Sequence, residues 1–132
     1  MWFRSMTPAP DGLPILGRSA RSLGVRVPDD VHPDTAGFVS TGTGGMSVSP
    51  ASMWNLPHHR RPRGAGRGST GPASDFIFST ETSVLAVQSL TVRLDPERPG
   101  KHAYVEPSER VLLAAYEQSL AATRSGWKLV QP

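Results

Sequence analysis

Apolar and polar positions follow one another along this chain in short runs that are typical of strands. In residues 90–95 (LTVRLD), apolar side chains occupy every second position, and residues 75–80 (DFIFST) place Phe76 and Phe78 two positions apart. Residues 1–6 (MWFRSM), 45–49 (GMSVS) and 101–107 (KHAYVEP) also read as alternating stretches. Because a period of two sends successive side chains to opposite faces of a strand, we expect five short β-strands.

A spacing of three and four residues replaces this pattern near the C-terminus. Pro107 suits the first turn of a helix, Ser108 or Glu109 favours its start, and Gly126 ends it. We expect a helix between these positions, with an apolar stripe toward the sheet formed by Leu112, Leu113, Tyr116 and Leu120.

The segments between these runs are predicted to be mostly loops. Residues 17–27 could hold one or two helical turns before a short extended piece, and residues 51–56 a helical turn anchored by Trp54. Residues 28–37 and 57–73 are interrupted by Pro and Gly and are expected to be loops. The elements together predict a single α+β domain over residues 1–132, in which strands outnumber helices.

The composition adds to this prediction of the fold and argues against disulfides and metal sites. Thirteen Gly and thirteen Pro make about a fifth of the 132 residues, against roughly 12% in an average protein, which favours short strands and long ordered loops. There is no Cys, and the four His residues show no ligand spacing, so we predict no disulfide and no metal site.

No stretch of the sequence is typical of a membrane or export signal. No run approaches the ~20 apolar residues of a membrane span, and the N-terminus lacks the apolar region of a signal peptide. We therefore expect synthesis in the cytoplasm and no membrane contact, with delivery into a target cell left open.

The basic residues are unevenly distributed, which changes the expected partners. The net charge is +3, and no acidic residue occurs between Asp34 and Asp75. That interval contains the arginines of PHHRRPRGAGRG: Arg60, Arg61, Arg63 and Arg67. Such a stretch attracts phosphate, in a nucleotide or in RNA. It has no aromatic side chain between Trp54 and Phe76 on which a base could stack, so a solvated loop is the alternative.

One phosphate-binding motif is present only in outline. Residues 66–71 (GRGSTG) match G-x-G-x-x-G, but a dinucleotide site needs a strand before the motif and a helix after it. HHRRPRGA precedes these residues and PASDFIF follows them, so we predict no Rossmann site here.

Arg4, Ser47 and Glu106 each have an ordinary explanation when taken alone. Arg4 can be an edge-strand side chain with its charged end in water, and Glu106 can favour a helix start through the macrodipole. Together, an arginine on the first strand, a serine after glycines on a middle strand and a glutamate on a late strand resemble NAD-dependent ADP-ribosyltransferases.

The chemistry of that enzyme class explains the three residue types. Arginine makes bidentate contacts to phosphate or ribose, and the serine strand shapes the nicotinamide pocket. The carboxylate stabilises positive charge on the ribose as nicotinamide leaves. The resemblance therefore implies that Arg4, Ser47 and Glu106 are catalytic. It places Arg4, Gly44, Gly45, Met46, Ser47 and Tyr104 against NAD. Trp54 is a second candidate wall of the pocket, although core packing is the favoured interpretation of this residue.

Four longer stretches resemble a narrower family, the Tse-type effectors of type VI secretion. In chain order they are WFRSM with DG soon after it, VRVPDDVHPDTAGFVSTGTGGMSV, DFIFSTETSVLAVQSLTVRLD and HAYVEPSERVLLAAYEQSLAATRSGWK. This likeness implies a small split β-sandwich of the ADP-ribosyltransferase type with a C-terminal helix. It also implies a toxic activity, an acceptor macromolecule and a cognate immunity protein. The chain departs from the family at Met46, where the toxins have threonine, and Ser49-Pro50 replaces an aromatic–acid pair. Glu106 is supported only by the broader transferase pattern.

Two alternatives to an active enzyme stay open. The chain can be a non-enzymatic basic domain that binds RNA or another anion through Arg60, Arg61, Arg63 and Arg67, or a transferase fold that has lost its chemistry. For an enzyme, we expect Arg4→Ala or Glu106→Gln to abolish activity without loss of stability. For a binding domain, neutralising the arginines removes both the affinity and its salt dependence.

Overall fold

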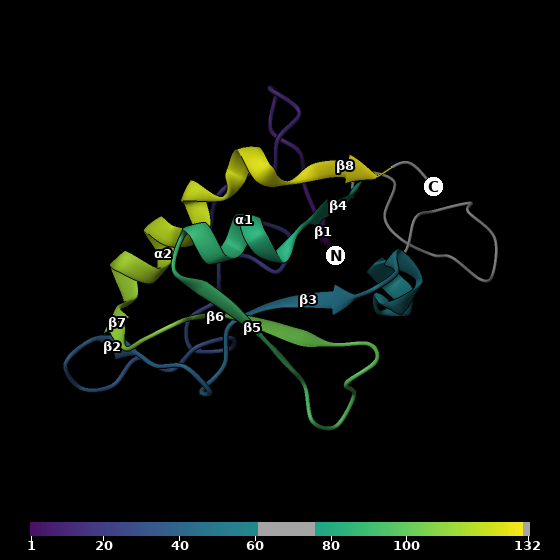
Figure 1. Ribbon diagram of the computed structural model, residues 1–132. Helices are drawn as coiled ribbons and strands as arrows, with labels where there is room; N and C mark the ends of the chain where they lie inside the picture. Colours follow the sequence, from purple (N-terminus) through teal and green to yellow (C-terminus); the bar gives the residue numbers. More distant parts are fainter. Residues whose placement is uncertain (61–75, 131–132) are drawn as a thin grey trace.

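A six-stranded antiparallel sheet organises the protein. The computed structural model describes residues 1–60 and 76–130. The order of strands in the sheet is β5-β6-β3-β1-β4-β8, and a separate pair of strands joins β2 to β7 (Figure 1). The strands are β1 (Trp2–Met6), β2 (Phe38–Val39), β3 (Met46–Pro50), β4 (Phe76–Thr80), β5 (Leu90–Leu94), β6 (Ala103–Pro107), β7 (Val111–Leu112) and β8 (Lys128–Val130).

Two α-helices and three short 3₁₀ turns accompany these strands. The helices are α1 (Thr82–Val87) and α2 (Leu113–Ala122), and the turns are η1 (Met53–Asn55), η2 (His58–Arg60) and η3 (Arg124–Gly126). In Figure 1, α1 and α2 lie on one side of β3, β5 and β6. No helix in residues 1–60 or 76–130 has the length and apolar character needed to cross a membrane.

The sheet consists of two halves that are held together by a short junction. Strands β1 and β4 pair over five residues, and so do β5 and β6. Between the halves, β1 and β3 pair only at Trp2↔Pro50 and Phe3↔Ser49. The ladder stops just before Arg4 on β1, so the two strands lack backbone pairing where Arg4 and Ser47 lie.

The helices cover the larger hydrophobic core on one face of the sheet. Leu85 of α1 and Tyr116 and Leu120 of α2 are fully buried against the strands. The strands contribute Met6, Met46, Val48, Phe78, Leu90 and Val105 to this core. A smaller cluster of Phe3, Leu56 and Ile77, with Met53 and Val130 beside it, forms on the other face. Because both faces are covered, even the polar residues of β1 are buried.

The alternating runs identify most of the sheet correctly. The five predicted strands correspond to β1, β3, β4, β5 and β6, and the expected turn within residues 51–56 is η1. The α+β class with more strands than helices is also confirmed. The predicted loop at residues 57–73 and the GRGSTG motif lie, except for residues 57–60, outside the described residues.

The prediction of helical turns in residues 17–27 is wrong. That segment forms turns and one isolated bridge, Leu16↔Leu23. The carbonyl groups of Ser19 and Ser22 accept hydrogen bonds from the side chain of Arg4. Leu23 and Val25 are buried in the main core. Tertiary contacts therefore fix this segment, and no repeating helical pattern is needed.

The C-terminal helix is shorter than its sequence pattern suggests. It begins at Leu113, because Val111 and Leu112 pair with Val39 and Phe38 as the small sheet. Tyr116 and Leu120 face the core as expected, whereas Leu112 is half exposed. Helix α1 and strand β8 have no counterpart among the predicted elements. Helix α1 has six residues and one buried side chain, so it carries no periodic stripe.

Candidate functional site

The side chain of Arg4 joins the two halves of the sheet where their backbone ladder ends. Arg4 is 6% exposed, and its Nη1 donates to the carbonyl of Ser47 at 2.7 Å. Its Nε and Nη2 donate to the carbonyl of Ser22 at 3.1 and 3.0 Å, and Nη2 also reaches that of Ser19 at 3.5 Å. Burial lowers the pKa of Arg4 to about 10, so the group stays cationic at neutral pH.

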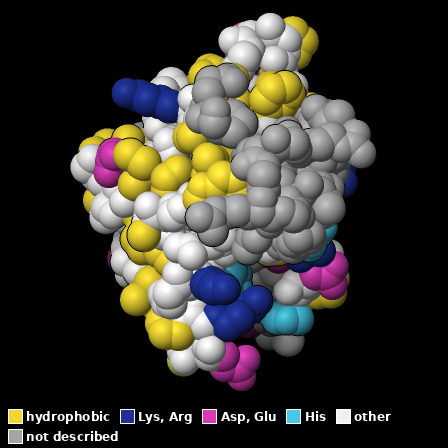
Figure 2. Space-filling model, turned by 90° about the vertical axis from the view of Figure 1, so that its right-hand side faces the viewer, with side chains coloured by type: hydrophobic (Ala, Val, Ile, Leu, Met, Phe, Trp, Pro, Cys, Tyr) yellow, Lys and Arg dark blue, Asp and Glu magenta, His cyan; other side chains and the backbone are white. Residues whose placement is uncertain are grey.

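A cavity of about 470 Å³ opens beside this arginine. Ser47 and Ser49 of β3 form part of its wall, and the η1–η2 segment and the β5–β6 loop form other parts. Its lining includes five Lys and Arg residues, namely Arg4, Arg26, Arg60, Arg98 and Lys101. Two histidines, His59 and His102, also line it. Figure 2 shows Lys and Arg side chains gathered close to histidine on the lower part of one face of the molecule.

The positive charge of this cavity is only partly compensated. Asp30 is the single acidic residue in the lining that the structure describes, and it pairs with Arg26 at 3.1 Å. Arg98 lies 3.5 Å from Asp95, which stands behind the lining. Lys101 makes no ion pair within residues 1–60 and 76–130. A concave surface with excess cationic groups favours a ligand that carries phosphate.

His102 is held in place at the rim of the β5–β6 loop. Its Nδ1 lies 2.8 Å from Oδ2 of Asp95, and its ring meets the ring of Tyr104 edge to face at 4.7 Å. The hydrogen bond from His102 lowers the pKa of the Asp95 carboxyl, with help from the backbone amide of Glu97. The aspartate therefore stays ionised beside the imidazole.

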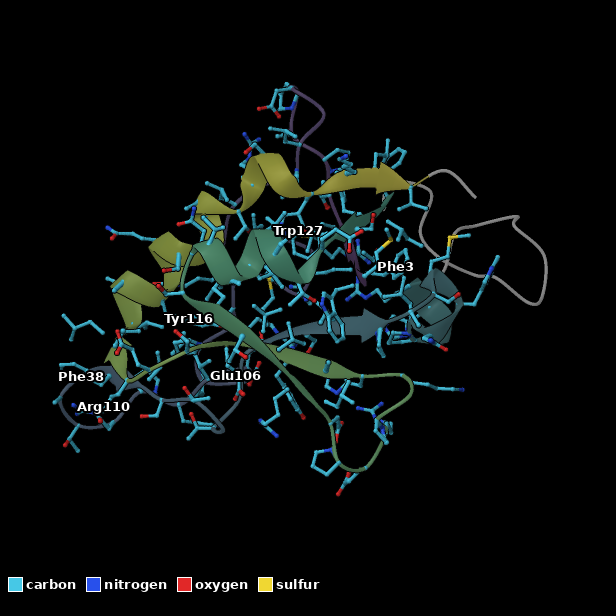
Figure 3. The ribbon with its side chains drawn as sticks, viewed as in Figure 1. Phe3, Phe38, Glu106, Arg110, Tyr116 and Trp127 are labelled. Atoms are coloured by element: carbon cyan, nitrogen blue, oxygen red, sulfur yellow. The ribbon has the colours of Figure 1, made fainter. Side chains whose placement is uncertain are left out.

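Glu106 lies in different surroundings, on the same strand as Tyr104. It is fully buried, and its Oε1 accepts from Nε of Arg93 at 2.9 Å. Its Oε2 accepts from Arg93 Nη2 at 3.3 Å and from the amides of Gly42 and Gly44 at 2.9 and 3.1 Å. Figure 3 shows Glu106 close to Tyr116. Glu106 does not line the cavity.

The structure therefore brings together two of the three residues that the transferase pattern predicts. Arg4 and Ser47 share the cavity, and the carboxylate in its lining is Asp30 where the pattern leads us to expect Glu106. Tyr104 and Trp54, expected as walls, are not lining residues either. Tyr104 instead packs between His102 and the guanidinium of Arg93, which lies 4.7 Å from its ring centroid.

The glycines of residues 44–45 serve packing in this structure. A Cβ on Gly45 would lie 2.2 Å from the carbonyl oxygen of Val105, and one on Gly44 would lie 2.5 Å from that of Asp30. Met46 is fully buried in the main core. None of these three residues lines the cavity, although we expected them against NAD. The lack of a side chain lets Gly45 lie directly on β6 and Gly44 directly on the backbone of Asp30.

Several lining residues were not singled out by the sequence. His102, Asp30, Arg98 and Lys101 come from loops, and Asp95 behind them ends a predicted strand. No spacing rule connects them, because the β5–β6 loop and residues 26–30 meet only in the folded chain. Of the predicted arginine cluster, Arg60 lines the cavity. Arg61, Arg63 and Arg67 lie outside the described residues.

Comparisons with protein-family models, with curated proteins and with solved structures give no match to this chain. The functional argument therefore depends on the cavity itself and on the residues that form it.

Proposed function

We propose that this protein is an NAD-dependent toxin of the ADP-ribosyltransferase class, and that NAD binds in the cavity beside Arg4. The observation that carries this proposal is the cavity lining, whose described residues include five Lys and Arg and one Asp. Its volume of about 470 Å³ falls within the roughly 300–1,000 Å³ of ligand pockets. The split between β1 and β3 and the α+β class support the narrower expectation of a split β-sandwich.

The lining residues divide into two groups by what they can offer NAD. Arg98 and Lys101 on the β5–β6 loop, with Arg60, can bind the pyrophosphate. Ser47, Ser49 and Asn55 provide polar groups for the ribose hydroxyls. Arg4 makes four hydrogen bonds to backbone carbonyls, so we assign it mainly a positioning role, in which it fixes the Ser47 strand.

The carboxylate for the transition state is best supplied by Asp30. NAD contributes a ribose–nicotinamide bond whose cleavage leaves positive charge on the ribose. A carboxylate in the same cavity stabilises that charge, as in glycoside cleavage. Both carboxylates accept hydrogen bonds, Asp30 from the amide and guanidinium of Arg26 and Glu106 from Arg93 and the amides of Gly42 and Gly44. Of the two, Asp30 lines the cavity and Glu106 does not. We therefore propose Asp30 in the role that the transferase pattern gives to Glu106.

Nicotinamide release by the purified protein tests this function directly. NAD is supplied with and without cell lysate, since the lysate contains candidate acceptor macromolecules. We expect wild type to release nicotinamide, and Asp30→Asn to lower kcat by about 100-fold, the order found for loss of one electrostatic stabiliser. Arg18→Gln, which changes a surface ion pair with Glu117 outside the cavity, is the matched control and keeps the wild-type rate.

The same assay separates the two carboxylates. Glu106→Gln keeps an amide oxygen that can accept from Gly42 and Gly44, so its folded fraction should retain activity. Activity lost with Glu106→Gln and kept with Asp30→Asn would return the catalytic role to Glu106. Folded wild-type protein that releases no nicotinamide in either condition would contradict the enzymatic proposal. A cognate immunity protein that blocks this cavity would inhibit the release.

A second candidate function is RNA binding at the same surface. The observation in its favour is that Arg60, Arg98 and Lys101 line the same cavity. Binding that depends on phosphate alone weakens steeply with salt and shows no nicotinamide release. Measurement of single-stranded RNA affinity at two salt concentrations, for wild type and Arg98→Gln/Lys101→Gln, distinguishes this function from the transferase.

A further inference from the structure

The Asp95–His102 pair has a geometry that goes beyond ligand binding. Oδ2 of Asp95 lies 2.8 Å from Nδ1 of His102, and its Oδ1 accepts from the amide of Glu97 at 2.9 Å. The amide of Asp95 in turn donates to the carbonyl of His102 at 2.9 Å. Asp95 is only 6% exposed. The carboxylate is thus fixed at both oxygens, and the imidazole is fixed against it.

This pairing determines which nitrogen of His102 can meet a ligand. An ionised carboxylate only accepts hydrogen bonds, so Nδ1 carries the proton in the neutral ring. Nε2 is then an acceptor, and His102 lines the cavity while Asp95 does not. The edge contact with Tyr104 holds the ring from its other side. An imidazole oriented by a carboxylate in this way is a typical general base.

Charged and titratable groups from several elements surround His102. The charged and titratable groups of the surrounding elements are Asp95, Arg98 and Lys101 in its own loop, Arg93 and Tyr104 on β5 and β6, and Arg4, Arg26, Asp30, His59 and Arg60 elsewhere in the lining.

We propose that His102, oriented by Asp95, is the general base that activates the acceptor of ADP-ribose. This inference rests on the proposed function. Nε2 of His102 takes the proton of the attacking O–H or N–H group as that group forms a bond to the ribose carbon. The ribose–nicotinamide bond breaks at the same time, and its electron pair leaves with the nicotinamide and neutralises the ring charge. The acceptor class is therefore a hydroxyl, an amine or water, each of which must lose a proton.

Chemical rescue tests the proposal. Nicotinamide release is measured for wild type, His102→Ala, Asp95→Asn and His32→Ala, with and without added imidazole. General-base removal costs ~10²–10⁴-fold, so His102→Ala should lower kcat at least 100-fold while KM for NAD changes less than threefold. Imidazole should restore His102→Ala at least tenfold, because it can occupy the vacated position and accept the proton. Asp95→Asn should lower kcat about tenfold and gain nothing from imidazole.

His32→Ala is the matched control, since His32 is exposed and lies outside the cavity lining. Its rate should equal that of wild type. A rate for His102→Ala within threefold of wild type overturns the inference and leaves the transferase proposal intact. Loss of activity that imidazole does not restore, together with a lower melting temperature, assigns His102 a structural role only and likewise overturns it. Folded wild type without any nicotinamide release overturns both proposals.

Discussion

Arg4 and Glu106 are two buried charges on the strands that flank β3, and their surroundings differ in a way that assigns their roles. Arg4 is bound by carbonyl oxygens of Ser19, Ser22 and Ser47 and lies on the wall of a cavity. Glu106 is bound by Arg93 and by the amides of Gly42 and Gly44, and it has no exposed surface. Both charged groups are held by hydrogen bonds, but only Arg4 adjoins a space that a ligand can enter.

The difference shows that residue type and order along the chain do not by themselves define an active site. The same transferase pattern selected both residues, and the backbone placed a ladder break beside one and a closed loop over the other. Buried charges are expensive unless they are paired, so each is also a structural element. Substitutions at the two positions should therefore test stability and activity separately.

The largest expected effect is a loss of folding stability on substitution of the enclosed Glu106. Glu106→Ala leaves the guanidinium of Arg93 and two amides without their acceptor. Breaking a buried pair by removal of one partner costs ~3–5 kcal/mol, and we expect about 3 kcal/mol because Arg93 is partly exposed. Urea unfolding monitored by circular dichroism measures the change. A loss below about 1 kcal/mol would contradict the pairing, since even one unsatisfied buried group costs ~1–3 kcal/mol.

The protein should also lose folding stability when the charge of Arg4, beside the cavity, is removed. Arg4→Ala leaves the carbonyls of Ser19, Ser22 and Ser47 without this donor, at about 2–3 kcal/mol in total. The hydrogen bonds of Arg4 therefore lead us to expect a loss of stability that the sequence did not predict. Arg4→Lys keeps the charge but cannot reproduce the fork of donors, so it should recover only part of the loss. Equal stability of Arg4→Ala and wild type in the same unfolding assay would be inconsistent with these contacts.

A substitution at Gly45, where the chain packs against β6, should have an intermediate effect on folding stability. Gly45→Ala places a Cβ 2.2 Å from the carbonyl oxygen of Val105, so β3 and β6 must shift. We expect a loss of about 1–3 kcal/mol, as for other overpacked sites. Gly100→Ala on the β5–β6 loop meets nothing within 4 Å and is the matched control, with little change. Thermal unfolding of the two variants side by side measures the difference.

The smallest expected effect is a pH dependence of folding stability that comes from Asp95, next to the cavity residue His102. The pKa of Asp95 is lowered in the folded protein, mainly by His102, so its carboxylate stabilises the fold at pH values above its unfolded pKa. That contribution disappears as the pH falls through the lowered pKa, in the acid range below about 4. Asp95→Asn should therefore lower the melting temperature at pH 6 and have less effect near pH 3. A difference from wild type that is constant between these pH values would contradict the assignment.

The sequence-based predictions were most successful where the spacing of apolar residues along a short segment determines its secondary structure. The alternation in LTVRLD and the short apolar run in DFIFST predict β5 and β4, because both patterns are local properties of a strand. The predictions were least successful where residues far apart in the sequence determine the structure. In residues 17–27, the carbonyl of Ser22 accepts a hydrogen bond from Arg4. Helix α2 begins later than predicted because Val111 and Leu112 pair with Val39 and Phe38.

The residues of the candidate site also divide into those that the sequence predicted and those that only the structure revealed. Arg4 and Ser47 were predicted from their strands, and the structure places both in the cavity lining. Asp30 and His102 could not be found from spacing, because loops bring them to the cavity only when the sheet has formed. The enclosure of Glu106 depends on Arg93 thirteen positions away and on amides more than sixty positions away. No local pattern contains that information.

Titration of the folded protein with NAD at low ionic strength tests the central claim most directly, using wild type, Arg98→Gln/Lys101→Gln and Glu106→Gln. If the cavity beside Arg4 is the binding site, wild type and Glu106→Gln bind NAD with similar affinity and the double variant binds at least tenfold more weakly. Binding that is absent in folded wild type, or that is lost with Glu106→Gln and kept in the double variant, would contradict the account.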